Sequence, residues 1–214
     1  MIARRTLLAG ATCLGAIHPT AAALPIRRGN RLAFDIVRKG SKIGSHVLTF
    51  QPEANRLIVR IAADIAVAFG PIVLFRYKHR ATERWEDGRV VSLDADTDDD
   101  GEKFAVKIRR DGDALAVEAN GKPRYIAPPN TTPATHWNRG MLDGPFVNTQ
   151  DGKLLRPSVI SLGTTTDLPR CPIPASGFAL RGDCDLDTWY DTAPRWVGLR
   201  FKGRDGTEIR YELA

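Results

Sequence analysis

The side chains best suited to form a binding or catalytic site are His136, Trp137 and Asn138, which are consecutive in an irregular stretch of the sequence. A histidine beside an aromatic ring could act as a general acid or base next to a bound molecule. The structural alternative is a hydrogen-bonded histidine that caps a short helix. Trp85 and Trp189 could line the same pocket, although tryptophans on hairpins more often pack across strands and into the core.

No known catalytic motif accompanies these residues. The sequence lacks the nucleophile motifs G-x-S-x-G and S-x-x-K, the metalloprotease motif H-E-x-x-H and any glycine-rich phosphate loop. We therefore predict no catalytic residue and no cofactor. The enzymatic alternative is a hydrolase of envelope glycan or lipid, which would need carboxyl groups with a raised pKa close to His136.

Three aspartates at alternate positions could bind a metal ion. Asp96, Asp98 and Asp100 precede Gly101 and match the opening D-x-D-x-D-G of a calcium loop. The twelfth position of that loop is Lys107, where a bidentate glutamate is needed, so an EF-hand is excluded. A looser calcium site in a hairpin and an acidic, solvated turn are the two interpretations left, and we expect the solvated turn.

Residues 1–23 have the three parts of a cleavable export signal. Arg4 and Arg5 form a basic head, an apolar run follows over residues 7–17, and Ala21-Ala22-Ala23 offers a cleavage site after Ala23. The apolar run is shorter than the ~20 residues that a membrane-spanning helix needs, and no later run is longer. We expect a periplasmic protein that has no membrane span.

The type of signal stays open. The paired arginines are similar to a twin-arginine signal, which carries folded proteins, and a general secretory signal is the alternative. Cys13 would anchor a lipoprotein, but the residues before it match that motif poorly.

Length and charge favour one soluble domain. Removal of residues 1–23 from the 214 leaves 191, and removal of the signal's two arginines lowers the net charge from +6 to about +4. We expect a single β-rich domain over residues 24–214 with no nucleic-acid partner. The densest basic group, which could contact acidic lipid or glycan, comprises Arg76, Lys78, Arg80 and Arg84.

Two cysteines, Cys171 and Cys184, remain after the signal is removed. An even number of cysteines in an oxidising compartment predicts a structural disulfide between them. Redox thiols or metal ligands are the alternatives, and the spacing of the pair is not the C-x-x-C spacing that lowers a thiol pKa.

Period-two alternation predicts a mostly β fold. Residues 57–69 are apolar at the odd positions, and turn dipeptides such as Asp87-Gly88 and Asp205-Gly206 separate further alternating segments. About ten strands follow, with one short helix that begins at Thr132-Pro133 and ends near Gly140. A single sheet of this length must curl to bury its apolar face, so we predict a highly curved antiparallel sheet or incomplete barrel.

A curled sheet of this kind often encloses a cavity. The sequence therefore favours a non-enzymatic domain that binds a hydrophobic or envelope-derived ligand, or a partner, in its concavity. A structural or assembly role is a further alternative, and the oligomeric state is left open.

Short motifs in a fixed order extend over the whole mature chain. They are Val37-Arg38-Lys39-Gly40, Ile43-Gly44-Ser45-His46, Tyr77-Lys78-His79, Glu83-Arg84-Trp85 with Asp87-Gly88, His136-Trp137-Asn138, Thr149-Gln150-Asp151-Gly152, Trp189-Tyr190-Asp191, and Trp196-Val197-Gly198-Leu199 followed by Asp205-Gly206 and Tyr211. In this order they resemble an uncharacterised family of exported proteobacterial proteins classed as a domain of unknown function. More distantly, the chain is similar to periplasmic β-spiral proteins of cell-envelope integrity. The resemblance implies a periplasmic domain and supplies no activity, cofactor or site residue.

Overall fold

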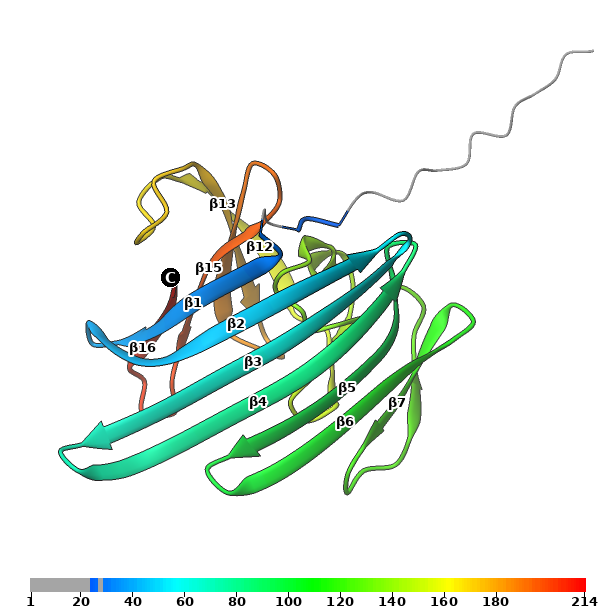
Figure 1. Cartoon of the computed structure of the whole chain (residues 1–214), viewed down its shortest axis with the longest axis horizontal. Coiled ribbons are helices and arrows are strands. Elements are labelled where there is room, and N and C mark those ends of the chain that lie inside the picture. Colours follow the sequence, from blue (N-terminus) through cyan, green and yellow to red (C-terminus); the bar gives the residue numbers. More distant parts are fainter. Residues whose placement is uncertain (1–23, 27–28) are drawn as a thin grey trace, which may run out of the picture.

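The computed structural model describes residues 24–26 and 29–214 (Figure 1), so the predicted export signal lies outside the described residues. The long strands of the first half are β1 (Arg31–Arg38), β2 (Ser41–Glu53), β3 (Arg56–Phe69), β4 (Ile72–Glu86), β5 (Arg89–Asp99), β6 (Glu102–Asp111), β7 (Ala114–Ala119) and β8 (Tyr125–Ala127). The second half contains β9 (Thr132–Pro133), the 3-10 helix η1 (Arg139–Asp143), β10 (Phe146–Val147), β11 (Leu154–Leu155), β12 (Ser158–Thr165), β13 (Ala175–Arg181), β14 (Leu186–Asp191), β15 (Trp196–Lys202) and β16 (Glu208–Leu213).

Thirteen of these strands form one antiparallel sheet that is not closed, in the order β12-β13-β14-β15-β16-β1-β2-β3-β4-β5-β6-β7-β8. The prediction of a mostly β, antiparallel sheet is confirmed, and the estimate of about ten strands was too low. The missed strands lack clean alternation: β12 is exposed at seven of its eight residues, and β14 is buried at five of six.

In the described part of the chain, the sheet curls around one large core cluster, with two smaller clusters beside it. Register shifts in five strand pairs, among them those at Val67/Ala68 and Arg84/Trp85, mark bulges or irregularities, and a bulge increases local twist. The inward face of β3 carries Leu57, Val59 and Ile61, which confirms the predicted buried face of that strand.

The turn dipeptides make the hairpins that they predict. Asp87 and Gly88 both have positive φ angles, +48° and +75°, and they join β4 to β5. Gly206 has φ +75° between β15 and β16. Positive φ at both central residues suits the right-handed twist of the strands that a two-residue turn joins.

A small second sheet, β11-β10-β9, lies against the core of the large sheet. The predicted helix from Thr132 is wrong, because Thr132 and Pro133 pair with β10 as strand β9. The helix begins later: Asn138 accepts a hydrogen bond from the backbone N–H of Gly140 and caps η1. Among the described residues there is no helix with the length and hydrophobicity needed to cross a membrane.

The predicted disulfide is also wrong, because Cys171 and Cys184 are free thiols in the structure. Cys171 packs with Trp189 and Val197 before the first residue of β13, whereas Cys184 lies after its last residue and packs elsewhere. A seven-residue strand spans roughly 20 Å at ~3.3 Å per residue, and a disulfide needs Cα atoms about 5.5 Å apart. Spacing along the chain therefore overstated how near the two cysteines are.

Candidate functional site

The candidate residues named from the sequence do not form one site. Trp85 and Trp137 meet in the core, His136 lines an inner cavity, and Trp189 lines a groove on the other face of the sheet. Asn138 serves as the cap of η1.

Trp85 and Trp137 share a buried carboxylate. Their ring centroids are 5.3 Å apart, and their indole N–H groups donate to Oε2 of Glu83 at 2.8 Å and 3.0 Å. Burial raises the pKa of Glu83, and the hydrogen bonds from the two indoles oppose this effect. This is the kind of carboxyl that a hydrolase would need, but Glu83 is 0 % exposed and out of reach of a substrate.

The inner cavity has a volume of about 250 Å³ and brings three histidines together. We call it the histidine chamber; its lining includes His46, His79, His136, Tyr77, Gln150, Leu48, Ile61, Trp196, Phe201 and Tyr211. His46 and His136 both pack against Trp196, with ring centroids 5.5 Å and 5.3 Å from it. The chamber is thus lined by strands of both halves of the sheet and by the segment before η1.

The histidines of the chamber are held uncharged. Burial lowers the pKa of His46 to about 3 and those of His79 and His136 to about 4. His79 Nδ1 lies 2.9 Å from the hydroxyl of Thr97. Both ring nitrogens of His46 and Nδ1 of His136 are buried without a hydrogen-bond partner among the described residues.

A second cavity of about 540 Å³ adjoins the chamber, because Tyr77, Gln150, Phe201 and Tyr211 line both. We call it the vestibule. Its walls are mainly apolar and include Ile43, Ile65, Val67, Phe75 and Ile209. Arg38 and Arg204 also line it.

Ion pairs join the walls of the vestibule, Arg38 with Asp205 and Arg204 with Asp99. Arg204, in the β15–β16 turn, lies 2.7 Å from Oδ2 of Asp99 at the end of β5, and its guanidinium lies 5.7 Å from the ring centroid of Phe75. Gln150 donates to the same carboxylate at 3.3 Å and accepts from the Tyr77 hydroxyl at 3.4 Å. Asp99 is nearly buried, and its Oδ1 has no hydrogen-bond partner in the described part of the chain.

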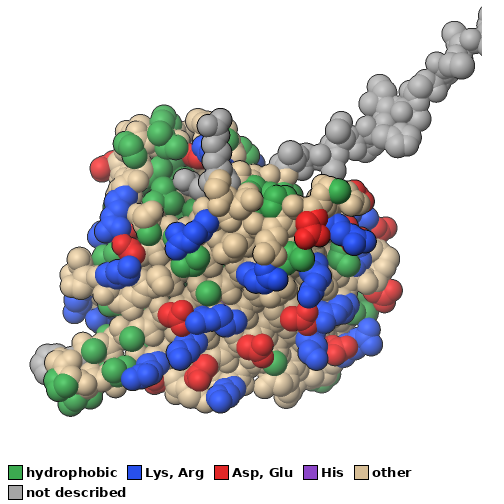
Figure 2. Space-filling view, viewed as in Figure 1, with side chains coloured by type: hydrophobic (Ala, Val, Ile, Leu, Met, Phe, Trp, Pro, Cys, Tyr) green, Lys and Arg blue, Asp and Glu red, His purple; other side chains and the backbone are tan. Residues whose placement is uncertain are grey.

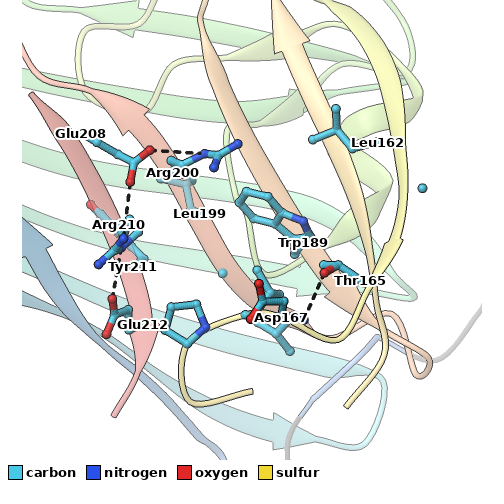
Figure 3. A pocket seen from close by; sticks show the side chains of 15 residues that line it. Leu162, Thr165, Asp167, Trp189, Leu199, Arg200, Glu208, Arg210, Tyr211 and Glu212 are labelled. Carbon is cyan, nitrogen blue, oxygen red and sulfur yellow. Dashed lines mark hydrogen bonds and ion pairs between the residues drawn. The ribbon is translucent and has the colours of Figure 1, made fainter. Parts of the chain in front are cut away.

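The groove that contains Trp189 lies on the outer face of β14, β15 and β16 and has a volume of about 590 Å³ (Figure 3). The guanidinium of Arg200 covers the indole at 5.3 Å from its centroid. Trp189 in turn lies over Gly177, where a Cβ would come within 2.6 Å of the indole nitrogen. Glycine therefore makes room for the ring.

The charges of this groove largely neutralise one another. Figure 3 shows Glu208 between Arg200 and Arg210, at 3.8 Å and 3.5 Å, and Arg210 also pairs with Glu212 at 3.2 Å. Because these side chains already have partners, the groove offers a ligand fewer unsatisfied groups than the histidine chamber does.

The three aspartates serve the β5–β6 hairpin. Asp98 accepts from the backbone N–H of Gly101, and Asp100 accepts from that of Arg76, whereas Asp96 is exposed on β5. Within residues 24–26 and 29–214 no three His, Cys, Asp or Glu side chains are grouped as metal ligands would be.

Sequence reasoning missed His46 and His79, because each falls inside a strand pattern. The signal that was available is the alternation of side chains along the strand. His79 lies two and four positions before Ala81 and Glu83 on β4, so its side chain points to the same inward face. A polar residue in phase with the buried positions of a strand marks a cavity or an internal hydrogen bond.

Comparison with known proteins agrees with this architecture. A β-barrel-like protein of domain of unknown function DUF1849 from Brucella abortus has a similar fold, with a TM-score of 0.61 over 86% of this chain and 94% of that chain, at 9% identity. No curated protein matches the sequence. A family model described as a domain of unknown function, DUF6134, matches residues 34–214. The resemblance to an uncharacterised family is thus confirmed, and the chain belongs to the DUF6134 family.

Proposed function

We propose that this domain is a non-enzymatic periplasmic protein that binds a hydrophobic, envelope-derived molecule inside its curled sheet. The observation that carries the proposal is the histidine chamber, in which buried ring nitrogens of His46 and His136 lack partners beside an apolar vestibule. An unsatisfied buried polar atom costs about 1–3 kcal/mol, so a ligand that supplies the missing hydrogen bonds would recover that energy.

The two cavities favour a ligand with an apolar body and an uncharged polar group. The vestibule supplies the apolar walls, and the chamber supplies imidazoles that stay neutral because of burial. A neutral imidazole has one N–H donor and one acceptor nitrogen, which match a hydroxyl or a carbonyl. None of the described Lys or Arg residues lines the chamber, so an anionic group would be poorly compensated there.

Native mass spectrometry of protein expressed with its own signal and recovered from the periplasm tests this proposal. We expect a retained molecule of apolar character on the wild-type chain, and about tenfold lower occupancy in His46→Phe, which removes both ring nitrogens. Lys107→Gln is the matched control, because Lys107 is exposed on β6 far from the cavities. An unliganded wild-type protein, or equal occupancy in His46→Phe, would refute the proposal.

A further inference from the structure

The tip of the β3–β4 hairpin carries a group of large apolar side chains that are exposed to solvent. Ile72, Val73 and Leu74 are 61%, 39% and 62% exposed. Figure 2 shows apolar side chains gathered at this projecting tip, and Lys and Arg side chains interspersed with Asp and Glu on the neighbouring outer face. We call residues 65–75 the hairpin tip.

The hairpin tip extends beyond both neighbouring strands. The last partner of β3 in β2 is Gly44, opposite Ile65, and the last partner of β4 in β5 is Asp99, opposite Tyr77. Between Ile65 and Tyr77, β3 and β4 therefore have register partners only in each other and project from the sheet, apart from the hydrogen bonds between Arg76 and Asp100 at the base (Figure 1). The packing of the core does not account for apolar residues at this place.

Charge changes sharply at the base of the tip. None of the eleven residues 65–75 has a charged or polar side chain, and Arg76 and Lys78 follow on the exposed face of β4. Neither of these two side chains forms an ion pair with the described residues, whereas the next cation, Arg80, pairs with Asp64. An uncharged tip beside cations that form no ion pair matches an anionic membrane, in which phosphate head groups cover the apolar acyl chains.

The tip also forms part of the mouth of the vestibule. Val67 and Phe75 belong to the tip and line the vestibule, together with Arg38 and Arg204 from the other turns at this end of the sheet. A bilayer contacted by the tip would therefore face the opening of the cavities.

We propose that the hairpin tip docks this protein on an anionic phospholipid surface by inserting Ile72, Val73 and Leu74 among the acyl chains while Arg76 and Lys78 contact the head groups. This goes beyond ligand binding, because docking would hold for an empty protein as well. A second copy is a poorer occupant, since tip-to-tip contact would bring the cations of both copies together.

Sedimentation of the full mature protein with vesicles tests the docking. We expect binding to vesicles of phosphatidylethanolamine mixed with phosphatidylglycerol and much weaker binding to phosphatidylcholine alone. The double variant Ile72→Ser, Leu74→Ser should bind at least tenfold more weakly, and Arg76→Gln with Lys78→Gln should lose roughly fivefold per charge, since each cation near such a surface contributes about 1 kcal/mol.

Matched controls separate docking from general surface effects. Ile160→Ser removes a residue of similar exposure, 52%, from β12, and Lys107→Gln removes an exposed cation from β6; neither should change vesicle binding. In Leu74→Trp the new indole should shift to shorter emission wavelengths with anionic vesicles. Unchanged vesicle binding of the double tip variant would overturn the proposal. So would a wild-type dimer that forms without lipid and that the double tip variant no longer forms. Vesicle binding should survive His46→Phe, so failure of ligand binding and failure of docking are distinguishable.

Discussion

Acid should unfold this domain through the three histidines of the chamber. In the folded chain the pKa of His46 is lowered to about 3, and those of His79 and His136 to about 4, whereas an unfolded histidine has its ordinary pKa of 6.5. A lowered folded pKa means that the unfolded state binds protons more readily. The stabilising contribution is therefore complete above pH 6.5 and is lost as the pH falls from 6.5 towards 3–4.

The size of the effect follows from these values. At pH 5, which is 1.5 units below the ordinary pKa, each histidine is protonated in the unfolded state but neutral in the folded state. At 1.36 kcal/mol per pH unit, each one lowers the free energy of unfolding by about 2 kcal/mol. Together the three should lower the free energy of unfolding by about 6 kcal/mol between pH 8 and pH 5. Glu83 acts in the opposite sense, since its raised pKa favours the folded state as the pH falls, and it offsets part of this loss.

Urea unfolding followed by tryptophan emission at pH 8 and pH 5 measures this difference. We expect the midpoint to fall by about 2 M, because m is roughly 2–3 kcal/mol/M for a domain of this size. His46→Phe should reduce the pH dependence by about a third, and Glu83→Gln should increase it. Equal midpoints at the two pH values, or an unchanged pH dependence in His46→Phe, would refute the reasoning.

Three further outcomes are expected. Glu83→Gln should lower the free energy of unfolding at pH 7 by less than about 1.5 kcal/mol. Glu83→Ala should lower it by about 3 kcal/mol, because it leaves two buried indole N–H groups unpaired; thermal unfolding measures both changes. Gly44→Ala should destabilise by about 2 kcal/mol or more in urea titrations, since its Cβ would lie 2.1 Å from the carbonyl oxygen of Asp64; stability equal to that of the wild type would contradict the close approach of β2 and β3. Unfolded protein without residues 1–23, and so without Cys13, should titrate two thiols. Cys184, whose pKa is raised to about 11, should react slowly when folded, and Cys171 should react only on unfolding; a mass two daltons below that of the dithiol would show that the disulfide forms after all.

The sheet was predictable where alternation and turn chemistry agree. β3 has one apolar face along its length, and Asp87-Gly88 can adopt the positive φ angles that a two-residue turn needs, so both were read from local sequence. Strands β12 and β14 were not predicted, because a strand that is buried on both faces, or on neither, shows no alternation of polar and apolar residues. Local pattern reports how a strand is buried and detects it only when the two faces differ.

The candidate site was less predictable because it is made by contacts between distant segments. His136 was singled out correctly as a residue of an irregular stretch, but its neighbours in the chamber, His46 and Tyr211, are far from it in the sequence. The supposed disulfide failed for the same reason, since thirteen positions of separation do not reveal a full strand between Cys171 and Cys184. Pairing register decides such distances, and one sequence does not specify the register.

The pairing of β16 with β1 has a consequence for the order of folding. Phe34 and Leu213 are register partners although they stand 179 positions apart, and this seam lies in the interior of the sheet order. Strands β2 to β8 can form from neighbouring hairpins, but β12 to β16 join them only through this seam. The rate-limiting step should therefore be the meeting of two preformed halves, a contact of high sequence separation that is slow to form. A circular permutant that links β16 directly to β1 and opens the chain between β8 and β9 would turn the seam into a hairpin and should fold faster.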